Sequence, residues 1–573
     1  MRSRFVLRVR ILSLFAIIGA LFLLVRLYFI QIVHGDEYRR QAAGQYMEAE
    51  GDEPLRGEIL FTKKDGEHPA AAVMQNGWRI AITPKDIQDP QASYTQLAAA
   101  ASSLDKDRFL KSVAKTGDPY EEVAFRLNDD EAAAVRNEKL PGVITVRDEW
   151  RFYPAGSLAA QTIGFVGYKG DQKEGVYGLE RYWEDTLRQD SDGLYVNPFA
   201  EIFSNVSALL TSDPTGQKGS IITSLEPSAQ RELETILQGV MSTYSPKLAG
   251  GIVMDPATGE IVAMAVLPSF DPNKYNLVDD PKRFINQLVE GRYEMGSIMK
   301  PLTMAAGIDA DAVSPHTTYN DTGCITKTGA KICNYDGKAR HVVAMQEVLS
   351  QSLNVGASYI VDEMGHAKFA DYVKRLGMGE ETGIDLPGEV PGDISSLFAQ
   401  GAADVDFASA SFGQAIAVTP IEMIRALAAL ANEGKLPEPH IVTAVRSTTG
   451  VERKISTADE TQVFRPETVE TVTNMLVKVY DDALLKGILK QDRYSIAAKT
   501  GTAQIGDPVT HKYSLDRFLH SFFGYFPAHD PKFIVFLYAV EPHGAEFASA
   551  TLAKPFDELA RFLINYYDIP PDR

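Results

Sequence analysis

The sequence has very few of the residues that build metal centres or disulfide frameworks. Its 573 residues include 2 cysteines, Cys324 and Cys333. Two cysteines alone cannot complete a structural zinc site, which takes four ligands. In an oxidising compartment the pair can close a small loop through a disulfide, whereas as free thiols the two would carry no structural meaning. The cysteine content therefore excludes a cysteine-built metal domain and leaves the disulfide open.

Motifs for nucleotides and for catalytic zinc are missing too. The chain contains no Gly-x-Gly-x-x-Gly fingerprint, no phosphate loop ending in Gly-Lys-Ser/Thr and no His-Glu-x-x-His. Its net charge is -19, so it lacks the concentrated lysine and arginine that nucleic acid binding requires. We therefore expect no cofactor, no metal ion and no nucleic acid partner.

A long apolar run occurs once, near the N-terminus. Residues 11–33 are largely apolar, and Ser13, Arg26 and Gln31 are the exceptions. As a helix this segment would span a bilayer, at about 1.5 Å per residue and roughly 35 Å in all. Arginines precede it and predict a cytoplasmic N-terminus: Arg2, Arg4, Arg8 and Arg10. No small-residue cleavage site follows, so an uncleaved anchor is favoured over a signal peptide, and residues 34–573 are expected outside the cytoplasmic membrane, on its periplasmic or extracellular face.

The exported part changes character near Ser220. Before it, residues 34–220 have a mixed and irregular pattern, with strand-like patches at 71–74 and 78–82 and a helix over 106–115 that stops at Gly117. After it, the expected elements are a strand at 221–226, a helix at 227–238, a β-hairpin of 249–254 with 260–266, helices from 300 to 431, strands at 494–498, 520–526 and 533–540, and a closing helix at 556–567 with Pro555 just before its first turn. Strands at both ends with helices between them predict one sheet flanked by helices, in an α/β or α+β domain.

Three short motifs bear on catalysis. An enzyme that acylates a serine without a histidine needs another base beside the hydroxyl, and a lysine three residues later on a helix lies on the same face. Burial or a neighbouring cation lowers the pKa of such a lysine, so that it accepts a proton. Ser-x-x-Lys occurs at Ser103–Lys106, Ser112–Lys115 and Ser297–Lys300; Lys-Thr-Gly occurs at Lys115–Gly117, Lys327–Gly329 and Lys499–Gly501; Ser-x-Asn occurs at Ser352–Asn354.

Context separates the copies. The motifs at 112–117 share one lysine and are typical of a helix end, whereas 103–106 lies among charged residues. The copy at 327–329 lies between the cysteines, with polar neighbours and no apparent strand leading into it.

The remaining copies form a consistent set. Ser297 opens an apolar helical segment, 298–308, and Ser352-Leu353-Asn354 lies between helical stretches at 345–349 and 357–364. Lys499 follows a short apolar strand, and Gly501 would let a substrate backbone approach an edge strand closely. The alternatives are a helix N-cap for Ser297 and a helix-end residue for Asn354.

Together with further matches in the same order, these motifs resemble the class B, monofunctional penicillin-binding proteins over nearly the whole chain. The other matching segments are 26–38, Arg56-Gly57-Glu58-Ile59, 153–164, 175–180, 377–389, 413–420, 499–504 and 523–527. The Asp-Arg that usually follows the Arg56 element is absent, and Glu422 stands where glutamine is common.

The resemblance implies a fold and a domain order. The catalytic domain would be a penicillin-binding transpeptidase or serine β-lactamase-like fold, with a central antiparallel sheet flanked by helices. We expect a cytoplasmic tail at 1–10, a membrane anchor at 11–33, a pedestal (dimerisation-type) domain at 34–220 and a transpeptidase domain at 221–573.

It also implies roles for single residues. Ser297 would attack the penultimate D-alanine carbonyl of a stem peptide, Lys300 would activate it, and Ser352 would relay a proton to the leaving D-alanine. Asn354 would hydrogen-bond the substrate amide, and Lys499 would set the electrostatics of the site. Thr500 and Thr502 would bind the terminal carboxylate beside Gly501, and the oxyanion would be met by the N–H groups of Ser297 and Thr502.

The implied partners are peptidoglycan stem peptides on lipid-linked or nascent strands, β-lactam antibiotics, and a membrane glycosyltransferase of the shape, elongation, division and sporulation class. One alternative is a membrane-anchored D,D-carboxypeptidase or β-lactamase, which would not need the long region before Ser220. Another is a non-catalytic β-lactam sensor or scaffold, although a sensor would need more than the short segment before Ile11 inside the cell.

Overall fold

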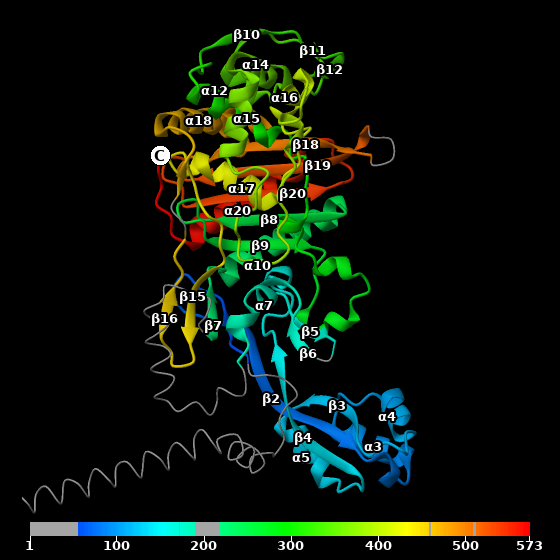
Figure 1. The fold of residues 1–573 in the computed structure, drawn as a ribbon. Coiled ribbons are helices and arrows are strands. Elements are labelled where there is room, and N and C mark those ends of the chain that lie inside the picture. Colours follow the sequence, from blue (N-terminus) through cyan, green and yellow to red (C-terminus); the bar gives the residue numbers. More distant parts are fainter. Residues whose placement is uncertain (1–55, 171, 190–217, 458–459, 508–511) are drawn as a thin grey trace, which may run out of the picture. The chain divides into compact units, whose positions relative to one another are not determined.

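The structure is a computed structural model that describes residues 56–170, 172–189, 218–457, 460–507 and 512–573 (Figure 1). The described residues form two compact units, one made of residues 75–150 and the other of the described residues in 56–74 and 151–573. Within the described residues no helix is both long and apolar enough to cross a membrane. The predicted anchor, residues 11–33, lies outside the described residues.

The smaller unit is a compact α/β body with its own core. Its elements are the second half of β2 (Ala70–Ile82), α3 (Pro90–Ala100), α4 (Lys106–Val113), β3 (Glu121–Leu127), α5 (Asp129–Asn137) and β4 (Val143–Phe152). Side chains of Asp89, Asp105 and Asn128 cap the three helices, and Asn128 does so in a capping box with Glu131. The two predicted strand patches are parts of the single strand β2, and the predicted helix ends at Val113, while α3 and α5 were not predicted.

The larger unit is built on a five-stranded antiparallel sheet. Its strand order is β18 (Ala497–Gly506), β19 (Tyr513–Phe526), β20 (Phe533–Val540), β8 (Leu248–Met254) and β9 (Ile261–Leu267). The hairpin β8–β9 is confirmed, with Asp255 in its turn accepting hydrogen bonds from the N–H groups of Ala257 and Gly259. Strands from both ends of the domain therefore meet in one sheet, as the sequence predicts.

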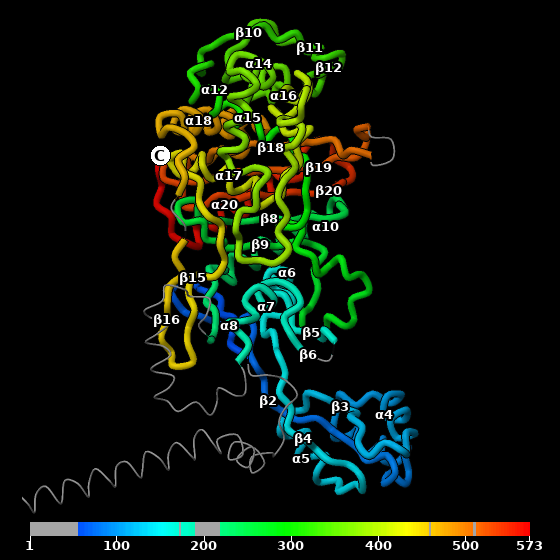
Figure 2. Tube along the Cα trace, viewed as in Figure 1, coloured from blue at the N-terminus to red at the C-terminus, as the bar shows by residue number. Residues whose placement is uncertain are grey.

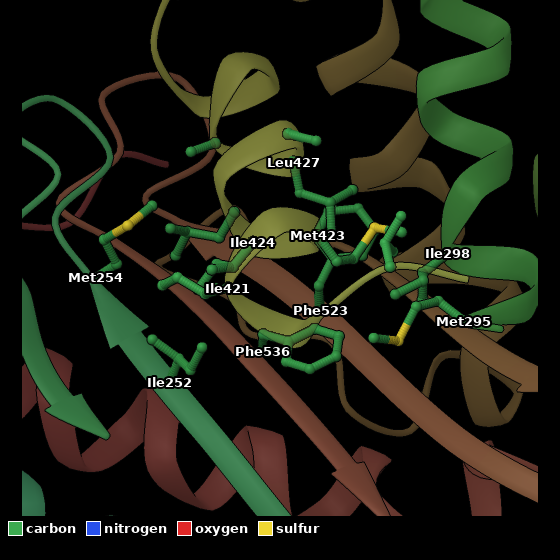
Figure 3. Packing of buried hydrophobic residues seen from close by; sticks show 14 of the residues in the cluster. Ile252, Met254, Met295, Ile298, Ile421, Met423, Ile424, Leu427, Phe523 and Phe536 are labelled. Atoms are coloured by element: carbon green, nitrogen blue, oxygen red, sulfur yellow. The ribbon is translucent and has the colours of Figure 1, made fainter. Parts of the chain in front are cut away.

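Helices cover both faces of this sheet. α10 (Pro227–Tyr244) and α20 (Ala553–Tyr566) pack on one face, and α17 (Pro420–Ala428) packs on the other. Figure 3 shows Ile421 and Ile424 of α17 on the side of the helix that faces Ile252 and Phe536 of the sheet. Each such buried side chain contributes about 1.5–3 kcal/mol. α20 begins before the predicted Phe556, so Pro555 stands inside its first turn, where backbone N–H groups have no helical partner anyway.

Four other strands of the larger unit belong to a second sheet. Their hydrogen-bonded order is β16 (Glu452–Lys454), β15 (Val442–Ser447), β7 (Gly219–Thr223) and β1 (Ile59–Leu60). Beside them, Glu180 of α7 (Gly178–Tyr182) is fully buried and accepts hydrogen bonds from Arg56 Nε at 2.6 Å and Arg151 Nε at 2.7 Å. Burial raises the pKa of Glu180, but the two guanidiniums outweigh it and the pKa is lowered. Two of the sequence motifs, around Arg56 and Glu180, thus meet in one buried ion cluster.

Glu422 joins two other motifs. Its Oε1 accepts the N–H groups of Gly379 at 3.0 Å and Gly392 at 2.8 Å, and its Oε2 accepts Thr419 N–H at 2.7 Å. A carboxylate, which only accepts hydrogen bonds, suits a position surrounded by backbone donors. This explains how glutamate serves where glutamine is common.

Four short strands interrupt the region that was predicted to be helical: β10 (Thr318–Asp321), β11 (Cys324–Lys327), β12 (Ala330–Cys333) and β13 (His341–Ala344). We call residues 318–344 the insert. β11 and β12 form a hairpin whose turn residues Thr328 and Gly329 both have positive φ, the geometry of a type I′ turn. Cys324 and Cys333 lie opposite each other and form a disulfide. The expectation that no strand leads into Lys327 was wrong, because four-residue strands are too short to show an alternating pattern.

The helices around the insert are α12 (Lys300–Asp309), α13 (Met345–Ser350), α14 (Asn354–Met364), α15 (His366–Arg375), α16 (Asp404–Ala410) and α18 (Pro466–Lys478). Figures 1 and 2 show α12, α14, α15, α16 and α18 gathered with β10, β11 and β12 beyond the β18 side of the sheet. The remaining short elements are β5 (Val166–Lys169), β6 (Gln172–Gly175), α6 (Ala160–Ile163), α8 (Glu184–Leu187), α11 (Gln287–Glu290), α19 (Ala548–Thr551), β14 (Lys435–Leu436) and β17 (Thr461–Gln462).

Candidate active site

Ser297 lies in a 3₁₀ turn, η7 (Gly296–Met299), which runs directly into α12. Its neighbours Met295 and Ile298 are buried and reach the core on the α17 side of the sheet (Figure 3). The N-cap positions of η7 and α12 are Met295 and Met299, and neither makes a side-chain cap. The N-cap alternative for Ser297 is therefore wrong, and its half-buried hydroxyl is held on a turn anchored in the core.

Two glycines fix that turn against its surroundings. Gly296 has a φ of +67°, and its N–H donates to the Gly413 carbonyl at 3.1 Å. A Cβ at Gly413 would lie 2.3 Å from the Gly296 oxygen, and a Cβ at Gly296 would lie 2.8 Å from the Thr502 oxygen. Backbone therefore packs against backbone on both sides of the serine turn. This close packing explains why position 413 is a glycine, since any side chain there would collide with Gly296.

Lys300 is the base nearest to Ser297. Its Nζ lies 3.0 Å from Ser297 Oγ, 3.0 Å from Ser352 Oγ and 2.6 Å from the Ser352 carbonyl oxygen. The side chain is only 1% exposed. Burial, and then the nearby Lys499 ammonium, lower the pKa of Lys300 well below its usual range. A neutral amine within hydrogen-bond reach of a hydroxyl can accept its proton.

Ser352 connects the two lysines. Its hydroxyl lies 3.1 Å from Lys499 Nζ as well as 3.0 Å from Lys300 Nζ. Its φ of +54° is in the left-handed region, which a non-glycine residue seldom adopts. Asn354 is the first residue of α14, and its Nδ2 donates to the Cys333 carbonyl at 2.9 Å. It does stand at a helix end, as the alternative had it, but its side chain does not cap that helix.

Lys499 lies inside strand β18, whereas the sequence analysis placed it after a strand. Residues 494–496 of the predicted strand precede β18, and the Lys-Thr-Gly triplet pairs with β19 along its length. Lys499 is 2% exposed, and burial lowers its pKa to about 7. β18 ends the order of the five-stranded sheet, so its outer edge pairs with no other strand of that sheet.

The two sides of β18 serve different contacts. A Cβ at Gly501 would lie 2.2 Å from Ser521 Oγ and 2.7 Å from the Met295 oxygen, so the space beside Gly501 is taken by the serine segment rather than left for substrate as we expected. Thr500 and Thr502 share the opposite, half-exposed face. Thr502 Oγ1 accepts the Ala548 N–H at 3.1 Å, which leaves its own O–H to donate to a carboxylate.

The other copies of the motifs lie apart from this cluster. Lys327 Nζ pairs with the Asp362 carboxylate at 2.6 Å, and Lys115 Nζ pairs with Glu121 at 2.7 Å. Ser103 and Lys106 are exposed in the smaller unit. The structure thus joins Ser297, Lys300, Ser352 and Lys499 by hydrogen bonds, with Asn354 beside them.

Three contributors to the site were not predicted from the sequence: Ser521, whose Oγ donates to the Met295 carbonyl at 2.8 Å; Ala548, whose N–H donates to Thr502 Oγ1; and Asn334, whose Oδ1 accepts the Val355 N–H at the start of α14. No local pattern marks such residues, because each acts on a partner more than 20 positions away. Among the described residues, no group of three histidine, cysteine, aspartate or glutamate side chains gathers in a way that would hold a metal ion.

Comparison with known proteins places the chain in a family. Residues 249–560 match the penicillin binding protein transpeptidase domain, and residues 51–197 match the penicillin-binding protein dimerisation domain. The chain belongs to the class B penicillin-binding proteins. As a member of this family it is a serine-type, β-lactam-binding peptidoglycan D,D-transpeptidase, and the resemblance seen in the sequence is confirmed.

Relatives and solved structures agree along most of the penicillin-binding chain. Stage V sporulation protein D of Bacillus subtilis is 28% identical over 96% of this chain and 84% of its own length. The probable peptidoglycan D,D-transpeptidase FtsI of Caulobacter vibrioides is 26% identical over 87% and 77%. Penicillin-binding protein 2X of Streptococcus thermophilus superposes with a TM-score of 0.70 at 21% identity, covering 90% of this chain and 81% of that one. Penicillin-binding protein 3 of Mycobacterium tuberculosis, solved with aztreonam, gives 0.68 at 21%, covering 91% and 98%. At these identities the structures show a shared fold.

Proposed function

We propose that Ser297 is the nucleophile of the transpeptidase and Lys300 its base. The observation that carries this is the buried Lys300 Nζ, 3.0 Å from Ser297 Oγ, with its pKa well below the usual range because of burial and the Lys499 charge. Lys300 takes the hydroxyl proton as Ser297 Oγ bonds to the carbonyl carbon of the penultimate D-alanine. The C–N bond to the terminal D-alanine then breaks and leaves an ester on Ser297.

Ser352 is the group that returns the proton. Its hydroxyl touches both lysines, so a proton accepted by Lys300 reaches the leaving amine through Ser352 Oγ. The amine of a second stem peptide then attacks the ester by the reverse route and releases Ser297. Lys499 holds a positive charge beside this relay and lowers the proton affinity of Lys300.

The substrate backbone lies along the open edge of β18 in this proposal, since an extended peptide adds to an unpaired strand. Thr500 and Thr502 bind the terminal carboxylate, and the N–H groups of Ser297 and Thr502 receive the oxyanion. Asn354 hydrogen-bonds the substrate amide with the part of its carboxamide that the Cys333 carbonyl does not occupy.

The test is covalent labelling with a fluorescent penicillin, followed by peptide mapping. The wild-type chain should carry a long-lived adduct on Ser297, and Ser297→Ala should carry none while remaining folded. Ser103→Ala, which disrupts another Ser-x-x-Lys copy, is the matched control and should label normally. An adduct on a different serine would overturn the assignment, and rapid turnover of the adduct would indicate a β-lactamase instead.

We infer that the enzyme works in cell-wall synthesis during division or sporulation, and one relative is named a stage V sporulation protein. It would be anchored by residues 11–33 with a cytoplasmic tail at 1–10, carry a pedestal at 34–220, and display the transpeptidase domain, 221–573, outside the membrane. A membrane glycosyltransferase of the shape, elongation, division and sporulation class would supply the glycan strands whose stem peptides it joins.

A further inference from the structure

α14, the helix that follows Ser352, begins without a cap of its own. Its N-cap residue is Leu353, which has no polar side chain, and the carboxamide of Asn354 is engaged by Cys333. The first N–H groups of a helix have no partner within it. Here Val355 N–H donates to Oδ1 of Asn334, at 3.2 Å, so a side chain 21 residues earlier in the chain supplies the cap.

Asn334 is itself held in one orientation. It is 2% exposed, and its Nδ2 donates to both oxygens of Asp321, at 2.9 and 3.0 Å. Asp321 is fully buried and also accepts the Arg340 N–H at 2.7 Å. Because a carboxylate only accepts hydrogen bonds, the amide nitrogen of Asn334 must face Asp321 and its oxygen must face Val355.

The insert forms hydrogen bonds with the chain on both sides of Ser352. Before Ser352, the Gln351 side chain accepts Arg340 Nε at 3.0 Å. After it, Asn354 and Val355 bond to Cys333 and Asn334. Figure 1 shows β10 and β12 of the insert next to α14.

These hydrogen bonds restrain a residue, Ser352, whose backbone is strained. A serine with a φ of +54° is in a region that non-glycine residues leave unless their surroundings determine the conformation. That conformation is also the one that directs both the hydroxyl and the carbonyl of Ser352 to Lys300. Relaxation of Ser352 would therefore move the proton relay away from both lysines.

We propose that Asn334 is a positioning residue of the transpeptidase, which holds the Ser352 hydroxyl between Lys300 and Lys499 by capping α14 from the insert. The inference rests on the proposed relay role of Ser352. It adds to that role a residue outside the three motifs, fixed by a buried carboxylate and joined to the hairpin that the Cys324–Cys333 disulfide closes.

The experiment measures the second-order acylation rate with labelled penicillin, per labelled molecule of full-length protein. Asn334→Ala should slow it at least tenfold, which is about 1.4 kcal/mol on the barrier. Asn320→Ala changes an exposed asparagine in the same insert and should stay within about twofold. In a Ser352→Ala background, the further loss caused by Asn334→Ala should shrink to less than about threefold, because residues that act as a unit are not additive.

Two results would overturn the inference. One is an Asn334→Ala protein that has a lower melting temperature, or a smaller fraction of molecules that can be labelled, while the molecules that are labelled acylate at the wild-type rate. The other is a full tenfold loss that persists on Ser352→Ala. If Asn334→Ala does not fold, hydrogen exchange of the unaltered protein decides: the Val355 amide must be protected, and exchange at the rate of an unbonded amide refutes the cap. If the wild-type protein is not labelled at Ser297, that result contradicts the proposed function instead of this inference.

Discussion

Lys499→Ala removes one of two amines that meet at a single oxygen. Each lysine Nζ lies about 3 Å from Ser352 Oγ, so the two nitrogens are no more than about 6 Å apart. At that separation and an effective dielectric constant of about 20, the repulsion between two ammonium groups is about 2.8 kcal/mol. That energy favours the neutral form of Lys300 roughly 100-fold. Loss of the Lys499 charge should therefore slow acylation by at least roughly 100-fold where Lys499 is charged.

The sign of the pH dependence follows from the pKa of Lys499. That pKa is lowered to about 7, so Lys499 carries its charge below pH 7 and loses it above. Its effect on Lys300 fades over the same range. The deficit of Lys499→Ala relative to wild type should accordingly be largest near pH 6 and narrow towards pH 8.5.

The assay is the acylation rate with labelled penicillin at several pH values, with circular dichroism to confirm folding. Lys327→Ala and Lys115→Ala are matched controls, because each alters an identical Lys-Thr-Gly triplet whose lysine is paired with a carboxylate elsewhere. Both should stay within about threefold of wild type. The prediction is wrong if Lys327→Ala is the variant with the strongly reduced acylation rate, or if the rate deficit of Lys499→Ala widens as the pH rises.

Three further outcomes are expected. A reporter active only outside the cytoplasm, fused after Arg573, should be active, and recovery of mature protein beginning near residue 34 would show a cleaved signal instead of an anchor. Arg56→Ala leaves the buried Glu180 with Arg151 as its remaining hydrogen-bonded cation and should lower the free energy of unfolding by about 3–5 kcal/mol, seen as a lower thermal midpoint; an unchanged midpoint would contradict the role given to the cluster. Gly413→Ala should push the Gly296 carbonyl and slow acylation at least tenfold, and normal rates would mean that the serine turn tolerates the shift.

The contact between Ser297 and Lys300 could be predicted because it depends on a short spacing in the sequence. Ser297 and Lys300 are three residues apart, so any helical turn brings them to one face. The competing triplets at Lys115 and Lys327 were separable by context alone, although the reason given for Lys327 was wrong. That residue does end a strand, and its carboxylate partner Asp362 explains its separation from the site.

What could not be predicted depends on contacts between distant segments. The insert was predicted to be part of a helical region because its strands are four residues long. Such strands are too short to show the alternation of apolar and polar residues that indicates a strand. Asn334 carries no signature, since a cap supplied from 21 positions away has no fixed spacing. Gly501 was assigned to substrate because glycine in an edge strand permits close approach, whereas the group that approaches is Met295 of the same chain.

The open edge of β18 has a consequence outside catalysis. An edge strand with unpaired N–H and C=O groups pairs with other extended chains, including the same strand of a second molecule. Proteins often guard such edges with an outward lysine, but Lys499 is buried and cannot serve. Two molecules joined edge to edge would each cover the strand edge along which we propose that the other binds its substrate, so self-association and substrate binding would compete. The break in register between Gln504 and Gly506 limits the length of strand that can be paired in error.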